Sequence, residues 1–95
     1  MEQASHTIEE HLGIILVDGQ RCEVWVRSEP DSDGIWHNAL LFRRAGARAP
    51  GRDALLTGVD WHVPPGIALN RARELGENEQ AALYRRAARP RSPFA

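Results

Sequence analysis

Alternating apolar and polar positions in the first two thirds of the chain predict β-strands. The clearest local signal is Asp18-Gly19, which separates two β-rich runs. This dipeptide readily adopts the positive-φ conformations of a type I′ turn, whose twist matches that of paired strands. A two-residue turn would set these residues opposite one another: Val17 and Gln20, Ile15 and Cys22, Gly13 and Val24, His11 and Val26.

The two faces of this predicted hairpin differ in polarity. One face is almost wholly apolar, and the alternation assigns it to the core: Ile15, Val17, Cys22, Val24 and Val26. The other face mixes apolar with charged side chains: Leu12, Ile14, Leu16 and Trp25 with Arg21, Glu23 and Arg27. The pattern leaves open which of the two faces lies under the rest of the protein.

Two further strands are predicted after the hairpin. Residues 28–34 form a polar loop, and residues 35–43 are apolar on both alternating sets, which is typical of a central strand covered on both faces. Residues 44–53 are rich in Gly, Ala, Pro and Arg and predict a loop. Alternation returns over residues 55–63, which we expect to form a half-buried strand.

Two helices are predicted to follow Pro64-Pro65-Gly66. The first runs from about Pro65 to Leu75, with Gly76 just beyond its end. The second runs from Glu79 to about Arg89, with Asn78 as its cap and Pro90 ending it. The apolar positions expected to pack against the sheet are Ala68, Leu69, Ala72, Leu75, Ala82, Leu83 and Ala87.

These elements predict an α+β fold: an antiparallel sheet of three to four strands (a β-meander) followed by two C-terminal helices packed on one face. The chain of 95 residues is expected to form a single domain over residues 1–90, with a flexible tail at 91–95. Its longest apolar stretch, residues 14–17, is far shorter than the roughly 20 residues of a membrane helix. The single cysteine, Cys22, fits a reducing compartment, so a cytoplasmic protein is expected.

Charge is divided unevenly along the chain. Residues 1–42 carry two arginines and eight acidic residues, a net charge of −6, while residues 43–95 carry ten arginines and five acidic residues, a net charge of +5. Such a division favours a charged or a self-complementary partner. If the sheet and the helices form two layers, it becomes a polarity between two faces of one domain.

A short stretch of the helical region resembles the turn of bacterial helix-turn-helix regulators. The resemblance rests on Ala72-Arg73-Glu74-Leu75-Gly76 followed by Leu83-Tyr84-Arg85-Arg86, and it would imply DNA binding by the second helix. The chain departs from the pattern at Glu77, where the family has an apolar residue. Carboxylates at Glu77 and Glu79 would also repel DNA phosphates from the start of the recognition helix. An ordinary αα-hairpin covering a sheet is therefore favoured.

Nucleic-acid binding without that motif is the second functional hypothesis. Its candidate phosphate contacts are Arg43, Arg44, Arg48, Arg52, Arg85, Arg86 and Arg89, and Trp36 or Trp61 could stack on bases. The isoelectric point of about 6.4 is well below that typical of nucleic-acid-binding domains, which disfavours this class.

Catalytic and metal-binding patterns are weak. The potential ligands His6, His11, His37, His62 and Cys22 show none of the short spacings of zinc motifs. The acidic run of residues 29–34 lacks the glutamate that would complete a calcium loop, because position 40 is Leu40, so turn chemistry explains it better. We therefore expect no enzyme activity, no metal ion and no cofactor.

The half-polar hairpin face provides the leading functional hypothesis. Trp25, Leu12, Ile14 and Leu16 would form an apolar patch rimmed by charged residues, as in protein–protein interfaces. We therefore expect a small non-catalytic protein–protein interaction module. Its partner would be another protein or a second copy of the chain, in a homodimer formed through the exposed sheet face.

Overall fold

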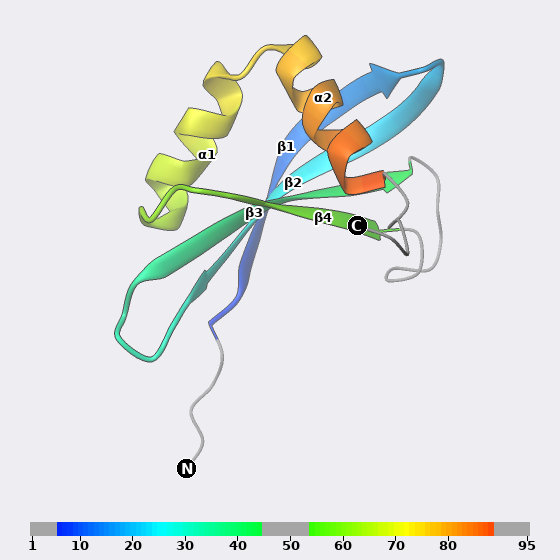
Figure 1. The fold of residues 1–95 in the computed structure, drawn as a ribbon. Coiled ribbons are helices and arrows are strands. Elements are labelled where there is room, and N and C mark those ends of the chain that lie inside the picture. Colours follow the sequence, from blue (N-terminus) through cyan, green and yellow to red (C-terminus); the bar gives the residue numbers. More distant parts are fainter. Residues whose placement is uncertain (1–5, 45–53, 89–95) are drawn as a thin grey trace.

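A four-stranded antiparallel sheet carries two helices on one of its faces (Figure 1). The computed structural model describes residues 6–44 and 54–88. Strands β1 (Ile8–Val17), β2 (Gln20–Pro30), β3 (Trp36–Arg44) and β4 (Ala54–Val59) lie side by side in chain order, and helices α1 (Pro65–Glu74) and α2 (Glu77–Ala88) follow. The predicted α+β fold is confirmed. The predicted 91–95 tail and all but Arg44 of the 44–53 loop lie outside the described residues.

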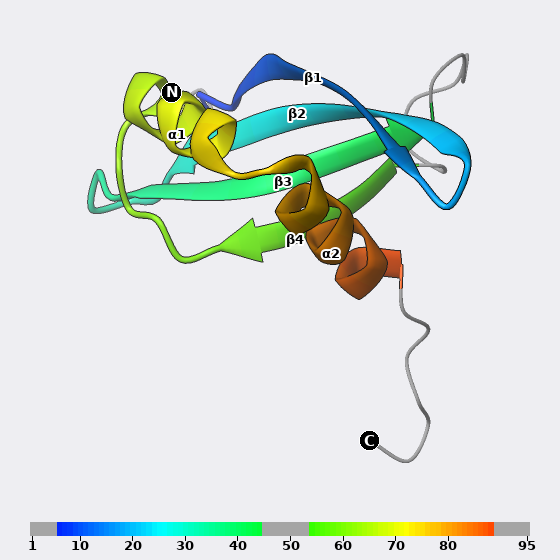
Figure 2. The same ribbon diagram turned by 90° about the horizontal axis from the view of Figure 1, so that it is seen from above.

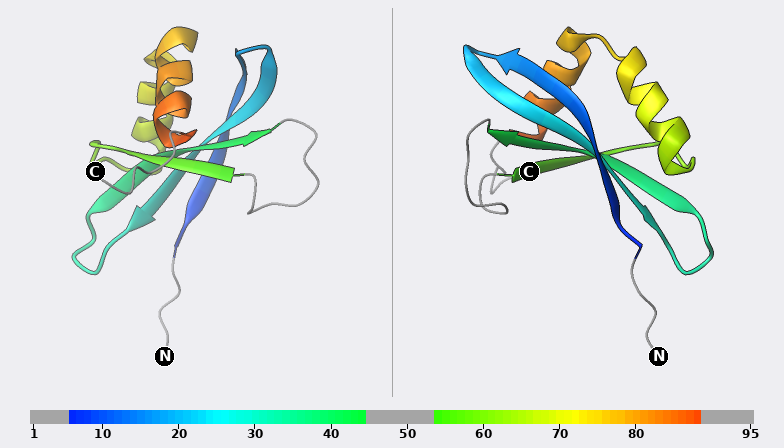
Figure 3. Two further views of the ribbon diagram at one scale, coloured as in Figure 1. Left: turned by 45° about the vertical axis from the view of Figure 1, so that its right-hand side comes forward. Right: turned by 180° about the vertical axis from the view of Figure 1, so that it is seen from behind.

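The helices share one side of a strongly twisted sheet. Seen from above, α1 and α2 both lie in front of the strands (Figure 2), and further views confirm that the opposite face carries neither helix (Figure 3). Helix α1 packs mainly over β2 and β1, whereas α2 packs over β4 and β1. One face of the sheet is therefore covered and the other is left open by the helices.

The β1–β2 hairpin has the predicted turn but not the whole predicted register. Asp18 and Gly19 both have positive φ (51° and 80°), and the expected pairing holds from Val17 to Gly13. Beyond Gly13 the register shifts, so His11 lies opposite Trp25 and not opposite Val26 as predicted. A β-bulge with an extra residue, Leu12, accounts for the shift and moves Leu12 out of the alternation.

Two strand ends differ from the prediction. Strand β2 continues to Pro30 because it pairs with β3 as far as Trp36, so the polar loop is shorter than the predicted 28–34. Strand β4 ends at Val59, not at residue 63. The Asn38 side chain donates hydrogen bonds to the carbonyl oxygens of Trp61 and Val63 (2.8 and 3.0 Å), which takes the place of strand pairing there.

Helix α2 begins two residues earlier than predicted. The backbone N–H groups of Glu79 and Gln80 donate to the carbonyl of Gly76 (both 3.0 Å), and Glu79 Oε1 accepts a hydrogen bond from the Gly76 N–H (3.0 Å). The Glu79 side chain therefore supplies one half of a capping box, with Gly76 at the N-cap. Asn78 therefore lies within the first turn, and its predicted role as the cap is wrong.

The core lies between the helices and the predicted core face of the hairpin. Val24, Val26, Leu40, Phe42, Ala68 and Ala72 are all 0% exposed. Small alanines at positions 68 and 72 let α1 approach the strands closely. On α2 the buried positions are Gln80 and Ala81, whereas Ala82, which was expected to pack inward, is exposed.

Candidate functional site

The open side of the sheet forms a continuous surface, here called the outer face. Cross-strand partners share a side of the sheet, so the pairing defines its members: Glu9, His11, Ile14 and Leu16 of β1; Arg21, Glu23, Trp25, Arg27 and Glu29 of β2; His37, Ala39, Leu41 and Arg43 of β3; Leu56 and Gly58 of β4. It is the half-polar hairpin face of the sequence prediction, extended over two more strands.

A largely apolar row crosses the middle of the outer face. Four opposite residues make this row, one from each strand: His11, Trp25, Leu41 and Leu56. Leu41 is only 6% exposed, but Leu56 is 50% exposed. On the hairpin side, Ile14 (53%) and Leu16 (58%) are also exposed. Exposed apolar residues scattered singly are ordinary, whereas larger exposed apolar patches with a polar rim are typical of binding surfaces.

Trp25 is the centre of this row. Its ring makes a T-shaped contact with His11 (centroids 4.8 Å apart), and the Arg43 guanidinium lies 5.8 Å from the ring centroid, within cation–π range. Within the described part of the chain, three N–H groups on this face are hidden from solvent without a hydrogen-bond acceptor: Trp25 Nε1, Arg27 Nε and Arg43 Nε.

The structure places three of the four predicted contact residues on the outer face. Trp25, Ile14 and Leu16 lie there, but Leu12 packs against the hydrophobic core on the helical side. The prediction that Leu12 lies opposite Trp25 is wrong, because the bulge puts His11 in that place. The sequence prediction did not include Leu41 and Leu56. Their strands alternate clearly, but only the register shows that they continue the Trp25 row.

Charges on the outer face are balanced. Three arginines and three glutamates lie on it: Arg21, Arg27 and Arg43 with Glu9, Glu23 and Glu29. Arg27 Nε and Glu9 Oε2 are 3.8 Å apart, a partly exposed ion pair. The polarity between two faces expected from the charge division is therefore not found on the described sheet.

A groove adjoins the apolar row at the end of the sheet where β2 and β3 connect. Its volume is about 430 Å³, and it is lined by Arg27, Glu29, Pro30, Asp31, His37, Asn38, Ala39 and Leu56. The lining combines apolar residues with side chains of both charge signs, a mixture that is also typical of protein interfaces.

The arginines of the nucleic-acid hypothesis are spread over several elements. Arg43 lies on the outer face, Arg44 ends β3, and Arg85 and Arg86 are exposed on α2. Arg85 is 3.1 Å from Asp18 in the β1–β2 turn. Arg48, Arg52 and Arg89 lie outside the described residues.

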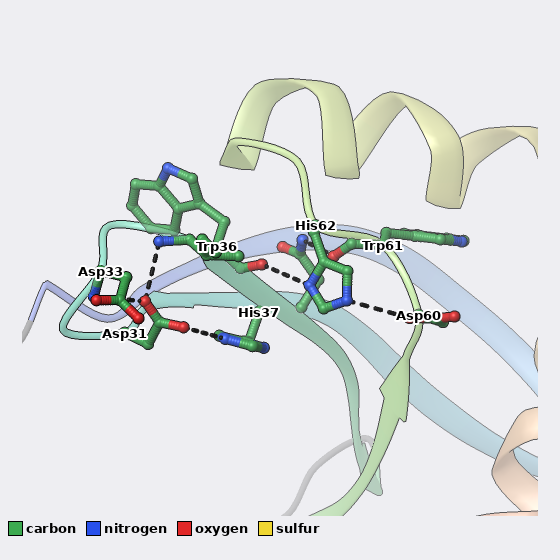
Figure 4. Close-up of polar contacts among 9 residues, drawn as sticks. Asp31, Asp33, Trp36, His37, Asp60, Trp61 and His62 are labelled. Atoms are coloured by element: carbon green, nitrogen blue, oxygen red, sulfur yellow. Dashed lines mark hydrogen bonds and ion pairs between the residues drawn. The ribbon is translucent and has the colours of Figure 1, made fainter.

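Two Asp–His pairs meet where the β2–β3 loop approaches the segment after β4 (Figure 4). Asp31 Oδ2 is 2.8 Å from His37 Nε2, Asp60 Oδ1 is 3.1 Å from His62 Nε2, and the two imidazole rings are in T-shaped contact at 5.1 Å. No sequence pattern predicted that these two histidines lie close together. Adjacent Trp-His dipeptides at 36–37 and 61–62 were the only sequence signal.

His62 contacts an acceptor with each ring nitrogen. Nδ1 lies 3.2 Å from the Trp36 carbonyl oxygen and Nε2 contacts the Asp60 carboxylate. No group of three or more His, Cys, Asp or Glu side chains suited to a metal ion occurs within residues 6–44 and 54–88. The cluster is thus an acid–base contact between two connecting segments.

Cys22 is the only thiol of the chain and belongs to the core. Its side chain is 3% exposed, and burial raises the pKa of the thiol above its ordinary value of 9.0, with a smaller opposing effect of the Arg44 charge. A raised pKa disfavours the nucleophilic thiolate. This matches the expected packing role of Cys22.

Comparison with known proteins finds no matching family model, no matching curated protein and no matching solved structure. Among the helices of the described residues, none is long and apolar enough to cross a membrane.

Proposed function

We propose that this protein is a non-catalytic protein–protein interaction module whose contact surface is the outer face of the sheet. The observation that carries the proposal is the row through Trp25, Leu41 and Leu56, which lies on the sheet face without helices. Exposed Ile14 and Leu16 extend it, and charged residues surround it. An apolar centre within a polar rim is the usual anatomy of a protein interface, and Trp and Arg supply much of the binding energy in such interfaces.

The charge balance of the outer face favours protein over nucleic acid. A nucleic-acid surface needs an excess of cations to neutralise phosphates, whereas this face carries as many glutamates as arginines. Nucleic-acid binding through Arg43, Arg44, Arg85 and Arg86 remains the second candidate. Titration with labelled duplex and single-stranded nucleic acid at two salt concentrations tests it, since an electrostatic complex forms first at low salt.

Site-specific photo-crosslinking in cells tests the interaction proposal. The photoreactive residue benzoylphenylalanine replaces Leu56 on the outer face or, as the matched control, Ile67 on α1. Both side chains are 50% exposed, so they differ in location and not in accessibility. We expect a discrete crosslinked protein product from position 56 and none from position 67. Absence of a product at position 56, or equal products at both positions, would contradict the proposal.

A further inference from the structure

We infer that the partner on the outer face is a second copy of this chain, packed face to face about a two-fold axis that lies between the two sheets, over Trp25 and perpendicular to β2. This inference rests on the proposed interaction function and names its partner. Two-fold symmetry requires a surface that complements itself, because each patch meets an identical patch. The outward side chains of β2 meet this requirement in charge, and the row of Trp25, Leu41 and Leu56 meets it in apolar character.

The charges along β2 are complementary to their own reversal. Its outward side chains are, in order, Arg21, Glu23, Trp25, Arg27 and Glu29. Reading this order backwards replaces each charge by its opposite and leaves Trp25 in the middle. A two-fold axis that lies between the sheets, at Trp25 and perpendicular to β2, produces this reversal. Each strand then faces the same strand of the second copy, which runs in the opposite direction.

Three kinds of contact follow from this axis. Glu23 faces Arg27 of the second copy and Arg21 faces Glu29 of the second copy, so four ion pairs form across the dimer. The row of Trp25, Leu41 and Leu56 lies along the axis, so each of these residues faces the same residue of the second copy. The apolar row becomes the dry centre of the interface, and the ion pairs surround it.

The same arrangement brings carboxylates of the second copy near the side chains of Arg27 and Arg43, two of the three residues with an unpartnered N–H group on this face. Glu23 of the second copy faces Arg27, whose Nε has no acceptor within the described chain. Arg43 comes to lie over Ala39 of the second copy, in the groove that Glu29 and Asp31 also line. A hidden N–H group without an acceptor is costly, so these donors favour an occupant with carboxylates at matching positions.

The β1 edge of the sheet is less suited to a second copy than the outer face. Strand β1 is an edge strand, and Glu77 Oε2 from the start of α2 accepts a hydrogen bond from the Leu16 N–H (3.3 Å). This carboxylate occupies a backbone donor that edge-to-edge pairing would use. The face, in contrast, carries no helix.

Charge reversal with mixing tests the axis. In a dimer of the Glu23→Arg variant, the new guanidinium faces Arg27 of the second copy. In a dimer of the Arg27→Glu variant, the new carboxylate faces Glu23 of the second copy. Sedimentation should therefore show a dimer for the unchanged protein and a dissociation constant raised by about tenfold or more for each variant alone. An equimolar mixture of the two variants should dimerise again, because both facing sites of the mixed dimer then place an arginine of one variant opposite a glutamate of the other.

A second pair and a control make the result specific. Arg21→Glu and Glu29→Arg should behave in the same way, separately weakened and restored on mixing, and they replace the first pair if circular dichroism shows either member unfolded. The control pair is Glu74→Arg and Arg86→Glu, both exposed on the helices. We expect each of these variants to dimerise like the unchanged protein.

The outcomes separate this inference from the proposed function. A monomeric unchanged protein, or a mixture that stays monomeric, overturns the two-fold dimer. If the Leu56 crosslink then joins a protein of different mass, the interaction function stands and only the second copy is excluded. A crosslinked product of twice the 10.6 kDa chain mass, together with restored dimers on mixing, supports both.

Discussion

At the scale of single residues, Asn38 joins three segments of the chain. Its side chain is in β3 and is almost fully buried (4% exposed). Oδ1 accepts a hydrogen bond from Ser28 Oγ in β2 (2.5 Å), while Nδ2 donates to the carbonyls of Trp61 and Val63 after β4. One amide therefore satisfies a buried hydroxyl and holds the segment that leads into α1.

Replacing Asn38 with Ala should lower the free energy of unfolding by about 2–4 kcal/mol, because it leaves a buried hydroxyl and two carbonyls without their partner. Urea denaturation measures the change. Asn70→Ala, at an exposed position of α1, is the matched control and should change stability by less than about 0.5 kcal/mol. Equal effects of the two substitutions would contradict the role assigned to Asn38.

Asp31 organises the β2–β3 loop through its carboxylate. Oδ2 accepts a hydrogen bond from His37, and Oδ1 accepts from the backbone N–H groups of Asp33 and Ile35 (2.8 and 3.0 Å). These bonds lower the pKa of Asp31 below its ordinary value of 3.8, the bond from His37 most and the backbone bond from Ile35 next. The acidic loop is therefore a turn held by side-chain hydrogen bonds, as the sequence predicted.

The pH dependence of stability should reflect this carboxylate. Because folding lowers its pKa, Asp31 stabilises the folded state above its ordinary pKa, and this contribution disappears as the pH falls through the folded-state value. Asp31→Asn should therefore show a smaller loss of stability between neutral pH and pH about 3 than the unchanged protein. Denaturant titrations across that range measure it. Asp33→Asn, which retains the backbone N–H used in the turn, serves as control.

At the scale of elements, the β1–β2 turn depends on backbone conformation. Asp18 and Gly19 have φ of 51° and 80°, a region that glycine enters without steric cost. Gly66, in the first turn of α1, has no positive φ and no atom within 4 Å of the position of an added Cβ. The same change from glycine to alanine should therefore have opposite effects in these two elements.

Gly19→Ala should destabilise the protein by about 1–2 kcal/mol because alanine is strained in the left-handed region. Gly66→Ala should stabilise it by about 0.5–1 kcal/mol, since alanine loses less conformational entropy in a helix. Thermal or urea unfolding of both variants provides the comparison. A loss of similar size at both positions would show that the two glycines are not distinguished by backbone conformation.

At the scale of the whole molecule, the sheet and the helices share one core. Phe42 of β3 is 0% exposed, and its ring makes a T-shaped contact with Tyr84 of α2 at 5.4 Å. Ala68 and Ala72 of α1 belong to the same hydrophobic cluster. The helices therefore cannot separate from the sheet without exposing its apolar face.

Cooperative unfolding is expected as a result. Phe42→Ala should cost about 3–5 kcal/mol, a large part of the roughly 5–15 kcal/mol that stabilises a typical domain. Tryptophan fluorescence and far-ultraviolet circular dichroism should change in a single coincident transition, at a lower denaturant concentration than for the unchanged protein. Ile67→Ala, at a half-exposed position of α1, should cost less than about 1 kcal/mol. Separate transitions for the two probes would contradict a shared core.

Much of this architecture could be predicted from local sequence. Alternation identified the strands and the core face of the hairpin, and Asp18-Gly19 identified the turn, because side-chain period and turn conformation depend on neighbouring residues. The same alternation correctly predicted that Trp25, Ile14 and Leu16 share one face. The prediction for Leu12 was wrong, because one extra residue in a bulge changes the side of the sheet on which Leu12 lies.

The rest depended on residues far apart in the chain. Register alone joins His11, Trp25, Leu41 and Leu56 into one row, and packing of the helices determines which sheet face stays open. The His37–His62 contact likewise joins two loops that are separate in sequence. Local sequence patterns show which side chains alternate along a strand. Which of these side chains contact one another depends on long-range strand pairing and burial, and no short segment of sequence indicates that pairing.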